Sequence, residues 1–146
     1  MKTIIIYEST HHGNTKKLVD AIVKKYGIKG MSIDEAEKID CSVYDTIGIA
    51  SGIAFGKFYK KTERFVSEKL PNGKNIFFLY TCERDNGKYA VSVSTSAEAK
   101  QCKVIGIYGC QGFDTYGPFK LIGGIAKGHP TQKEIDGAVN FYAKLK

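Results

Sequence analysis

An apolar strand, a polar loop and an amphipathic helix follow one another at the start of the chain. Thr3–Tyr7 is predicted to be a buried strand, and Thr15–Tyr26 is predicted to be a helix because apolar residues recur in it at helical spacing. A helix start leaves backbone N–H groups without intrahelical partners and carries partial positive charge. This order therefore predicts an anion-binding pocket at the first strand–helix turn, and a phosphate monoester fits such a pocket.

The loop between this strand and this helix supplies the side chains that we expect around the anion. They combine hydroxyl, amide and imidazole groups with a glycine that lets the backbone come close to a ligand: Ser9, Thr10, His11, His12, Gly13, Asn14 and Thr15. The same residues also fit a plain helix cap preceded by a turn. The density of donors directly after the first strand favours a ligand site.

This loop resembles the phosphate loop of flavodoxins, which has the form Ser/Thr-x-Thr-Gly-Asn/x-Thr. Thr10 matches the first hydroxyl, Asn14 the amide and Thr15 the last hydroxyl. His12 stands where a threonine is usual, and Ser9 takes the place of Thr10 if the loop is one residue longer. The resemblance implies a protein with FMN as its cofactor, and it leaves open which hydroxyl contacts the phosphate.

Apolar runs alternate with amphipathic stretches along the rest of the chain, as in a parallel sheet with helices on both faces. Further strands are expected at Gly30–Ile33, Thr46–Ala50, Asn75–Tyr80 and Lys103–Tyr108. Helical segments are expected at Asp34–Ile39, at Tyr59–Leu70 and after the capping box that begins at Thr131.

The segment Lys88–Lys100 is ambiguous, because the fold requires a helix there while Val91 and Val93 favour a strand. With the resemblance, the pattern predicts one domain over residues 1–146. Its fold class would be α/β: a three-layer, doubly wound, five-stranded parallel sheet, flavodoxin-like, in the order 2-1-3-4-5.

In that order a ligand belongs at the carboxyl ends of strands one and three, where three loops meet. In the loop after strand three, Phe55, Phe58 and Tyr59 would supply an apolar wall for the flavin ring. The resemblance to flavodoxins implies that Gly52 or Gly56 contacts the N5 atom of the flavin. The expected contacts of this loop are Gly52, Ile53, Ala54, Phe55, Gly56, Lys57 and Phe58, although Phe58 also fits the core face of the next helix. In the loop after strand four, the resemblance assigns contacts to Thr81, Cys82, Glu83 and Tyr89, with Tyr89 stacking on the ring.

Composition and motifs narrow the function classes. The apolar share of 42% and the charged share of 25% are typical of a soluble protein, and no apolar run approaches the ~20 residues that span a membrane. We therefore expect a cytoplasmic protein with no membrane partner.

The chain contains no motif for a metal or a dinucleotide. Its four cysteines show no metal-binding spacing, so we expect reduced thiols and no metal site. No Gly-x-Gly-x-x-Gly follows a strand, which leaves a dinucleotide cofactor unsupported.

The net charge of +7 bears on the partners. A basic carrier is steered toward acidic surfaces, and the lysines are spread along the chain, so nucleic acid is not an expected partner. We expect a one- or two-electron carrier between redox proteins with acidic docking surfaces, with no catalytic residue of its own, as a monomer or a homodimer.

Two alternatives stay open. One is an FMN-dependent NAD(P)H oxidoreductase similar to quinone reductases, whose substrate loop would be Cys110–Pro130 with Phe113, Tyr116 and Phe119. The other is a flavodoxin-like module that binds a partner without a flavin.

Overall fold

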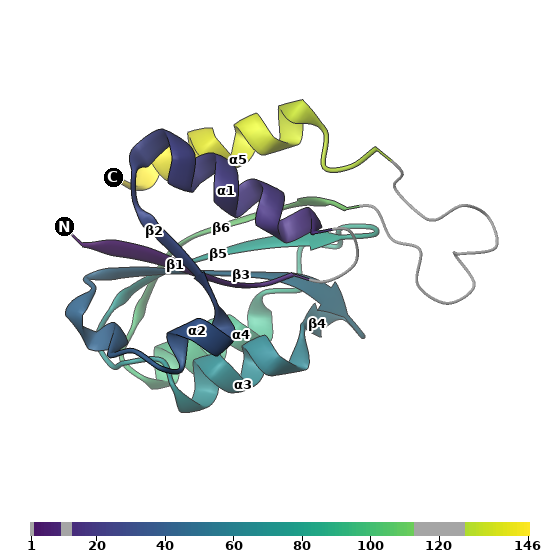
Figure 1. Cartoon of the computed structure of the whole chain (residues 1–146). Helices are drawn as coiled ribbons and strands as arrows, with labels where there is room; N and C mark the ends of the chain where they lie inside the picture. The colour runs from purple at the N-terminus through teal and green to yellow at the C-terminus, as the bar shows by residue number, and fades with distance from the viewer. Residues whose placement is uncertain (1, 10–12, 113–127) are drawn as a thin grey trace.

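The computed structural model describes residues 2–9, 13–112 and 128–146. The predictions for Thr10, His11, His12 and residues 113–127 lie outside these ranges. A sheet lies between two layers of helices (Figure 1). Its strands are β1 (Thr3–Glu8), β2 (Lys29–Ser32), β3 (Thr46–Ala54), β4 (Lys57–Phe58), β5 (Asn75–Cys82) and β6 (Lys103–Gln111).

Helices cover both faces of this sheet. On one face lie α1 (Asn14–Tyr26) and α5 (Gln132–Leu145), and on the other lie α2 (Ile33–Ala36), α3 (Lys60–Glu68) and α4 (Val91–Ala99). A 3-10 turn, Cys41–Val43, precedes β3. The three-layer α/β prediction is confirmed. None of the helices in the described part of the chain is both long enough and apolar enough to cross a membrane.

The parallel strands run in the order β2-β1-β3-β5-β6. Counted among the parallel strands, this is the predicted order 2-1-3-4-5. A sixth strand was not predicted: β4 pairs antiparallel with the end of β3, through Ile53 with Phe58 and Ala54 with Lys57.

The central strands β1, β3 and β5 each contribute to two cores, one on either face of the sheet. Alternate residues of one strand point to opposite faces, so both sets must be apolar when helices cover both sides. In β1, Ile4 and Ile6 pack toward α3, while Ile5 packs toward α1. This explains the continuous apolar runs in the sequence. Gly48 leaves room for the ring of Phe77, since a Cβ at Gly48 would lie 2.3 Å from that ring.

The ambiguous segment Lys88–Lys100 contains a helix, α4. Val93 and Ala97 lie four residues apart and are both buried, so one helical face packs on the sheet. Packing of this face outweighs the weak strand preference of the valine and threonine residues. The helix required by the fold is therefore the correct reading.

Candidate functional site

The carboxyl ends of β1, β3 and β5 meet along one edge of the sheet. In-register pairing sets Glu8 beside Ser51, and Gly52 beside Thr81. The residues that follow each strand therefore come from distant parts of the sequence and gather at one place. This is the edge at which doubly wound sheets bind ligands.

The start of α1 lies at this edge. Gly13 is the N-cap residue and has a φ of 64°, a left-handed conformation that favours glycine. The first turn of α1 contains no acidic residue, and Lys16 and Lys17 lie in it. The Lys16 N–H donates to the Ser9 hydroxyl at 3.3 Å, so Ser9 reaches across the loop to this helix start. Such a helix start favours an anion.

Two buried hydroxyls join this helix to the sheet. Thr15 Oγ1 and Thr81 Oγ1 are 2.8 Å apart, and both residues are buried. Asn14 is also buried and lies close to Gly112, where an added Cβ would be 2.8 Å from its amide nitrogen. The start of α1 is thereby held against the ends of β5 and β6.

The segment after strand three is a hairpin, and its prediction as an open loop was wrong. Ser51–Ala54 extends β3, and two residues connect it to β4. These are Phe55, with a φ of 54°, and Gly56, with a φ of 77°. Two consecutive left-handed residues between paired strands form a type I′ turn, which usually carries Asn-Gly. The Phe55 side chain is 98% exposed at the tip.

Phe58 packs in the core. It is 1% exposed, and its ring meets Phe78 edge-on at 5.7 Å between centroids. The structure therefore supports the interpretation of Phe58 as a core residue. Of the expected ring contacts, Phe55, Gly56 and Lys57 lie exposed at the tip of the hairpin, whereas Ile53 and Ala54 lie in β3.

Buried hydroxyls fix the base of this hairpin. Ser51 Oγ accepts the Tyr59 N–H and the Thr62 hydroxyl, both at 3.1 Å, and donates to the Gly52 carbonyl at 2.8 Å. The phenol of Tyr59 lies over Gly52, where a Cβ would be 2.3 Å from its oxygen. Tyr59 was expected in the apolar wall of the flavin ring, whereas Ser51 was not among the predicted contacts. Continuing the Ile53–Phe58 and Ala54–Lys57 ladder sets Tyr59 opposite Gly52.

Two phenols hold the turn after β5. Tyr80 donates to an Asp85 carboxylate oxygen at 2.7 Å, and that oxygen also accepts the Gly87 N–H at 2.9 Å. Burial, together with Asp85, raises the pKa of Tyr80 well above its ordinary value. Tyr89 donates to the Arg84 carbonyl at 2.7 Å and packs edge-on against Tyr80. These contacts tie the turn to the side chain at position 80 of β5.

The remaining predicted residues of this region divide between strand and turn. Thr81 and Cys82 belong to β5, and Cys82 packs into the core on the α3 side. Glu83 follows the strand, and its carbonyl accepts the Gln111 side chain at 3.0 Å.

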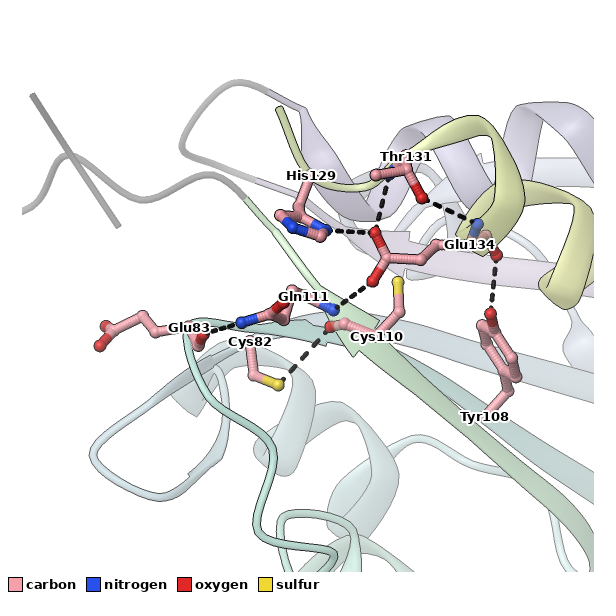
Figure 2. Close-up of polar contacts among 8 residues, drawn as sticks. All are labelled: Cys82, Glu83, Tyr108, Cys110, Gln111, His129, Thr131 and Glu134. Atoms are coloured by element: carbon pink, nitrogen blue, oxygen red, sulfur yellow. Dashed lines mark hydrogen bonds and ion pairs between the residues drawn. The ribbon is translucent and has the colours of Figure 1, made fainter. Parts of the chain in front are cut away.

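Figure 2 shows a polar cluster around Glu134, near the end of β6. The Glu134 carboxylate accepts N–H groups from Thr131 at 2.8 Å and from Gln111 at 3.3 Å, and His129 Nδ1 contacts it directly. Burial alone would raise the pKa of Glu134, but the hydrogen bonds from Thr131, His129 and Gln111 outweigh burial and lower it. The predicted capping box is confirmed. His129, two residues before the N-cap residue Thr131, also contacts this carboxylate.

The two cysteines near this edge are unreactive thiols. Burial raises the pKa of Cys82 and of Cys110 to about 12. The two residues pack on opposite faces of the sheet, and the Cys82 thiol donates to the Cys110 carbonyl. Both remain protonated at neutral pH, so neither provides a nucleophile.

Comparisons with known proteins agree with this architecture. A family model described as "Flavodoxin domain" matches residues 4–111. The chain is 32% identical over 143 residues to an uncharacterized protein of Methanocaldococcus jannaschii, covering 97% of this chain and 95% of that protein.

Solved structures show the same fold at low identity. Oxidised flavodoxin 2 from Bacillus cereus has a TM-score of 0.66 at 16% identity, over 99% of this chain and 97% of that one. A Fusobacterium nucleatum flavodoxin bound to flavin mononucleotide has a TM-score of 0.61 at 15% identity, over 99% and 98% of the two chains.

The Glu134 cluster leads to a prediction about acid stability. Because the folded-state pKa of Glu134 is lowered, its contribution to stability is present above pH 4.5, the ordinary carboxyl value, and is lost as the pH falls through the folded-state pKa. We expect Glu134→Gln to lower the free energy of unfolding by about 1–2 kcal/mol at pH 7 and to differ little from wild type in acid. Urea unfolding across this pH range measures the difference. Asp136→Asn, on the exposed side of α5, is the control, and an E134Q deficit that does not change with pH would contradict the assignment.

Proposed function

The chain belongs to the flavodoxin domain family, and on that premise we propose that it binds FMN and carries electrons between redox proteins. The start of α1 is the observation that carries the proposal. A glycine N-cap, a first turn without acidic residues and the buried Thr15 hydroxyl lie together at the carboxyl end of β1. These groups fit the phosphate of FMN, which is a dianionic monoester. The bound FMN named for the Fusobacterium nucleatum flavodoxin supports the same cofactor here.

The β3–β4 hairpin and the turn after β5 would hold the isoalloxazine ring. An exposed aromatic side chain in a left-handed conformation costs on the order of 1 kcal/mol and points to a functional reason. Phe55 would supply the apolar wall that a flat ring needs, and the Gly56 backbone would approach the ring edge. When bound, FMN supplies reversible one- and two-electron transfer, so the chain needs no acid or base of its own.

The positive charge of the chain supports the proposal that its redox partners have acidic docking surfaces. The net charge is +7, and Lys57 is exposed beside Phe55 at the tip of the hairpin. An acidic docking surface would be attracted to this edge of the molecule, from which electrons would leave the ring.

An absorbance scan of the purified protein tests the proposal directly. Flavin bands that persist through gel filtration would support it, and a protein that takes up no FMN would instead be a binding module without a flavin. Rapid bleaching of the bound flavin by NADPH alone would contradict a pure carrier and favour an NAD(P)H oxidoreductase.

The hydroxyl of Thr15 should affect phosphate binding selectively. We expect Thr15→Val to weaken FMN binding about 10-fold, because a charge-assisted hydrogen bond is lost, and to leave riboflavin binding unchanged. Fluorescence titration of the apoprotein with both ligands measures the two affinities. Thr46→Val, a buried threonine at the opposite end of β3, is the matched control. Equal losses for FMN and riboflavin would show that Thr15 does not contact the phosphate.

We expect Phe55 to lower the stability of the apoprotein and to strengthen flavin binding. Asparagine adopts the left-handed conformation more readily and suits the first position of a type I′ turn. We expect Phe55→Asn to raise the free energy of unfolding of the apoprotein by about 0.5–1 kcal/mol and to weaken flavin binding. Chemical denaturation and flavin titration of one preparation measure both effects. A variant that loses stability would contradict the inferred strain.

The basic residues around the site should affect the reduction potentials of the bound flavin. Positive charge nearby favours added negative charge on the reduced flavin, so we expect a less negative second reduction potential than in acidic flavodoxins. Lys57→Glu should make it more negative, whereas Lys25→Glu, near the far end of α1, should not. Spectroelectrochemistry measures both potentials. A very low second potential in the wild type would contradict this expectation.

A further inference from the structure

Three hydroxyls lie in a row across the strand ends. Thr15 Oγ1 contacts Thr81 Oγ1 at 2.8 Å, which sets the Thr81 side chain on the α1 face of the sheet. Gly52 pairs with Thr81, and paired residues of neighbouring strands point to the same face. The Tyr59 phenol, which lies over Gly52, is therefore on the α1 face as well. The row runs from the start of α1 across β5 to β3.

The position of Tyr59 is fixed by its backbone. Its N–H is shared between Ser51 Oγ at 3.1 Å and the Gly52 carbonyl at 3.3 Å, and Tyr59 is the N-cap residue of α3. The phenol can lie over β3 only because residue 52 has no side chain, since a Cβ there would be 2.3 Å from the phenol oxygen. A glycine at a strand position commonly marks a close approach of this kind.

We propose that the Tyr59 hydroxyl binds the ribityl chain of FMN. This inference rests on the proposed function, in which the phosphate lies at the start of α1. The next group along FMN is a short polyol, whose hydroxyls both donate and accept hydrogen bonds, as the hydroxyls of Thr81 and Tyr59 do. Neighbouring strands are about 4.8 Å apart, so the row extends from the phosphate position by a distance that suits a short chain. The Tyr59 hydroxyl is then assigned to the ribityl chain and not to the wall of the ring.

Three flavins separate the possible contacts, because they differ in one group at a time. FMN has phosphate, ribityl chain and ring; riboflavin lacks the phosphate; lumiflavin lacks both the phosphate and the ribityl chain. We expect Tyr59→Phe to weaken FMN and riboflavin binding by the same factor, about 5–10-fold, and to leave lumiflavin binding unchanged. Gly52→Ala should also weaken FMN and riboflavin binding, because the added Cβ displaces the phenol. Titrations of the apoprotein, followed by flavin fluorescence, give the affinities.

Tyr26→Phe, at the far end of α1, is the matched phenol control and should bind all three flavins as the wild type does. Circular dichroism shows that each variant is folded. Unchanged FMN and riboflavin affinities in folded Y59F would overturn the proposal, and so would an equal loss of lumiflavin, which would assign the hydroxyl to the ring. A wild-type protein that binds none of the flavins would instead contradict the proposed function itself.

Discussion

Parallel pairing in register is the constraint on which the rest of this structure depends. It aligns the ends of β1, β3 and β5, so that residues near positions 15, 52 and 81 become neighbours. Because β1, β3 and β5 are buried on both faces, a shift of one residue would exchange the residues of the two cores. The geometry of the candidate site is thus set by core residues that never contact a ligand.

Buried hydroxyls then connect the segments that meet at the aligned strand ends. Ser51 forms hydrogen bonds with Tyr59 and Thr62 at the base of the β3–β4 hairpin, and Thr15 forms one with Thr81, which joins α1 to β5. Buried polar groups are costly unless they are paired, so these pairs specify one arrangement of the segments they join. A ligand that binds at this edge therefore contacts groups whose positions are already fixed by these hydrogen bonds.

The sequence was sufficient to predict the elements that have a regular apolar pattern or a local capping motif. The alternation of strands and helices and the capping box at Thr131 follow from periodicity and local capping chemistry, and the first helix, predicted from Thr15, begins at Asn14. The strand order followed from the resemblance to flavodoxins. The β3–β4 hairpin was not predicted, because Phe55 is an unusual residue in a type I′ turn and masked the turn signal. The contact of His129 with Glu134 and the position of Tyr59 over Gly52 depend on tertiary packing, which no local pattern encodes.

Glu134 has a consequence for how this fold can diversify. The residues on either side of segment 113–127, Gln111 and His129, both contact its carboxylate, so the two flanks are tied together independently of what lies between them. The entropy of closing a loop grows only with the logarithm of its length, by about 0.6 kcal/mol for each doubling. Insertions and deletions at this point are therefore energetically cheap. The chain between Gln111 and His129 can therefore change in length during evolution while the sheet and the candidate site keep their structure.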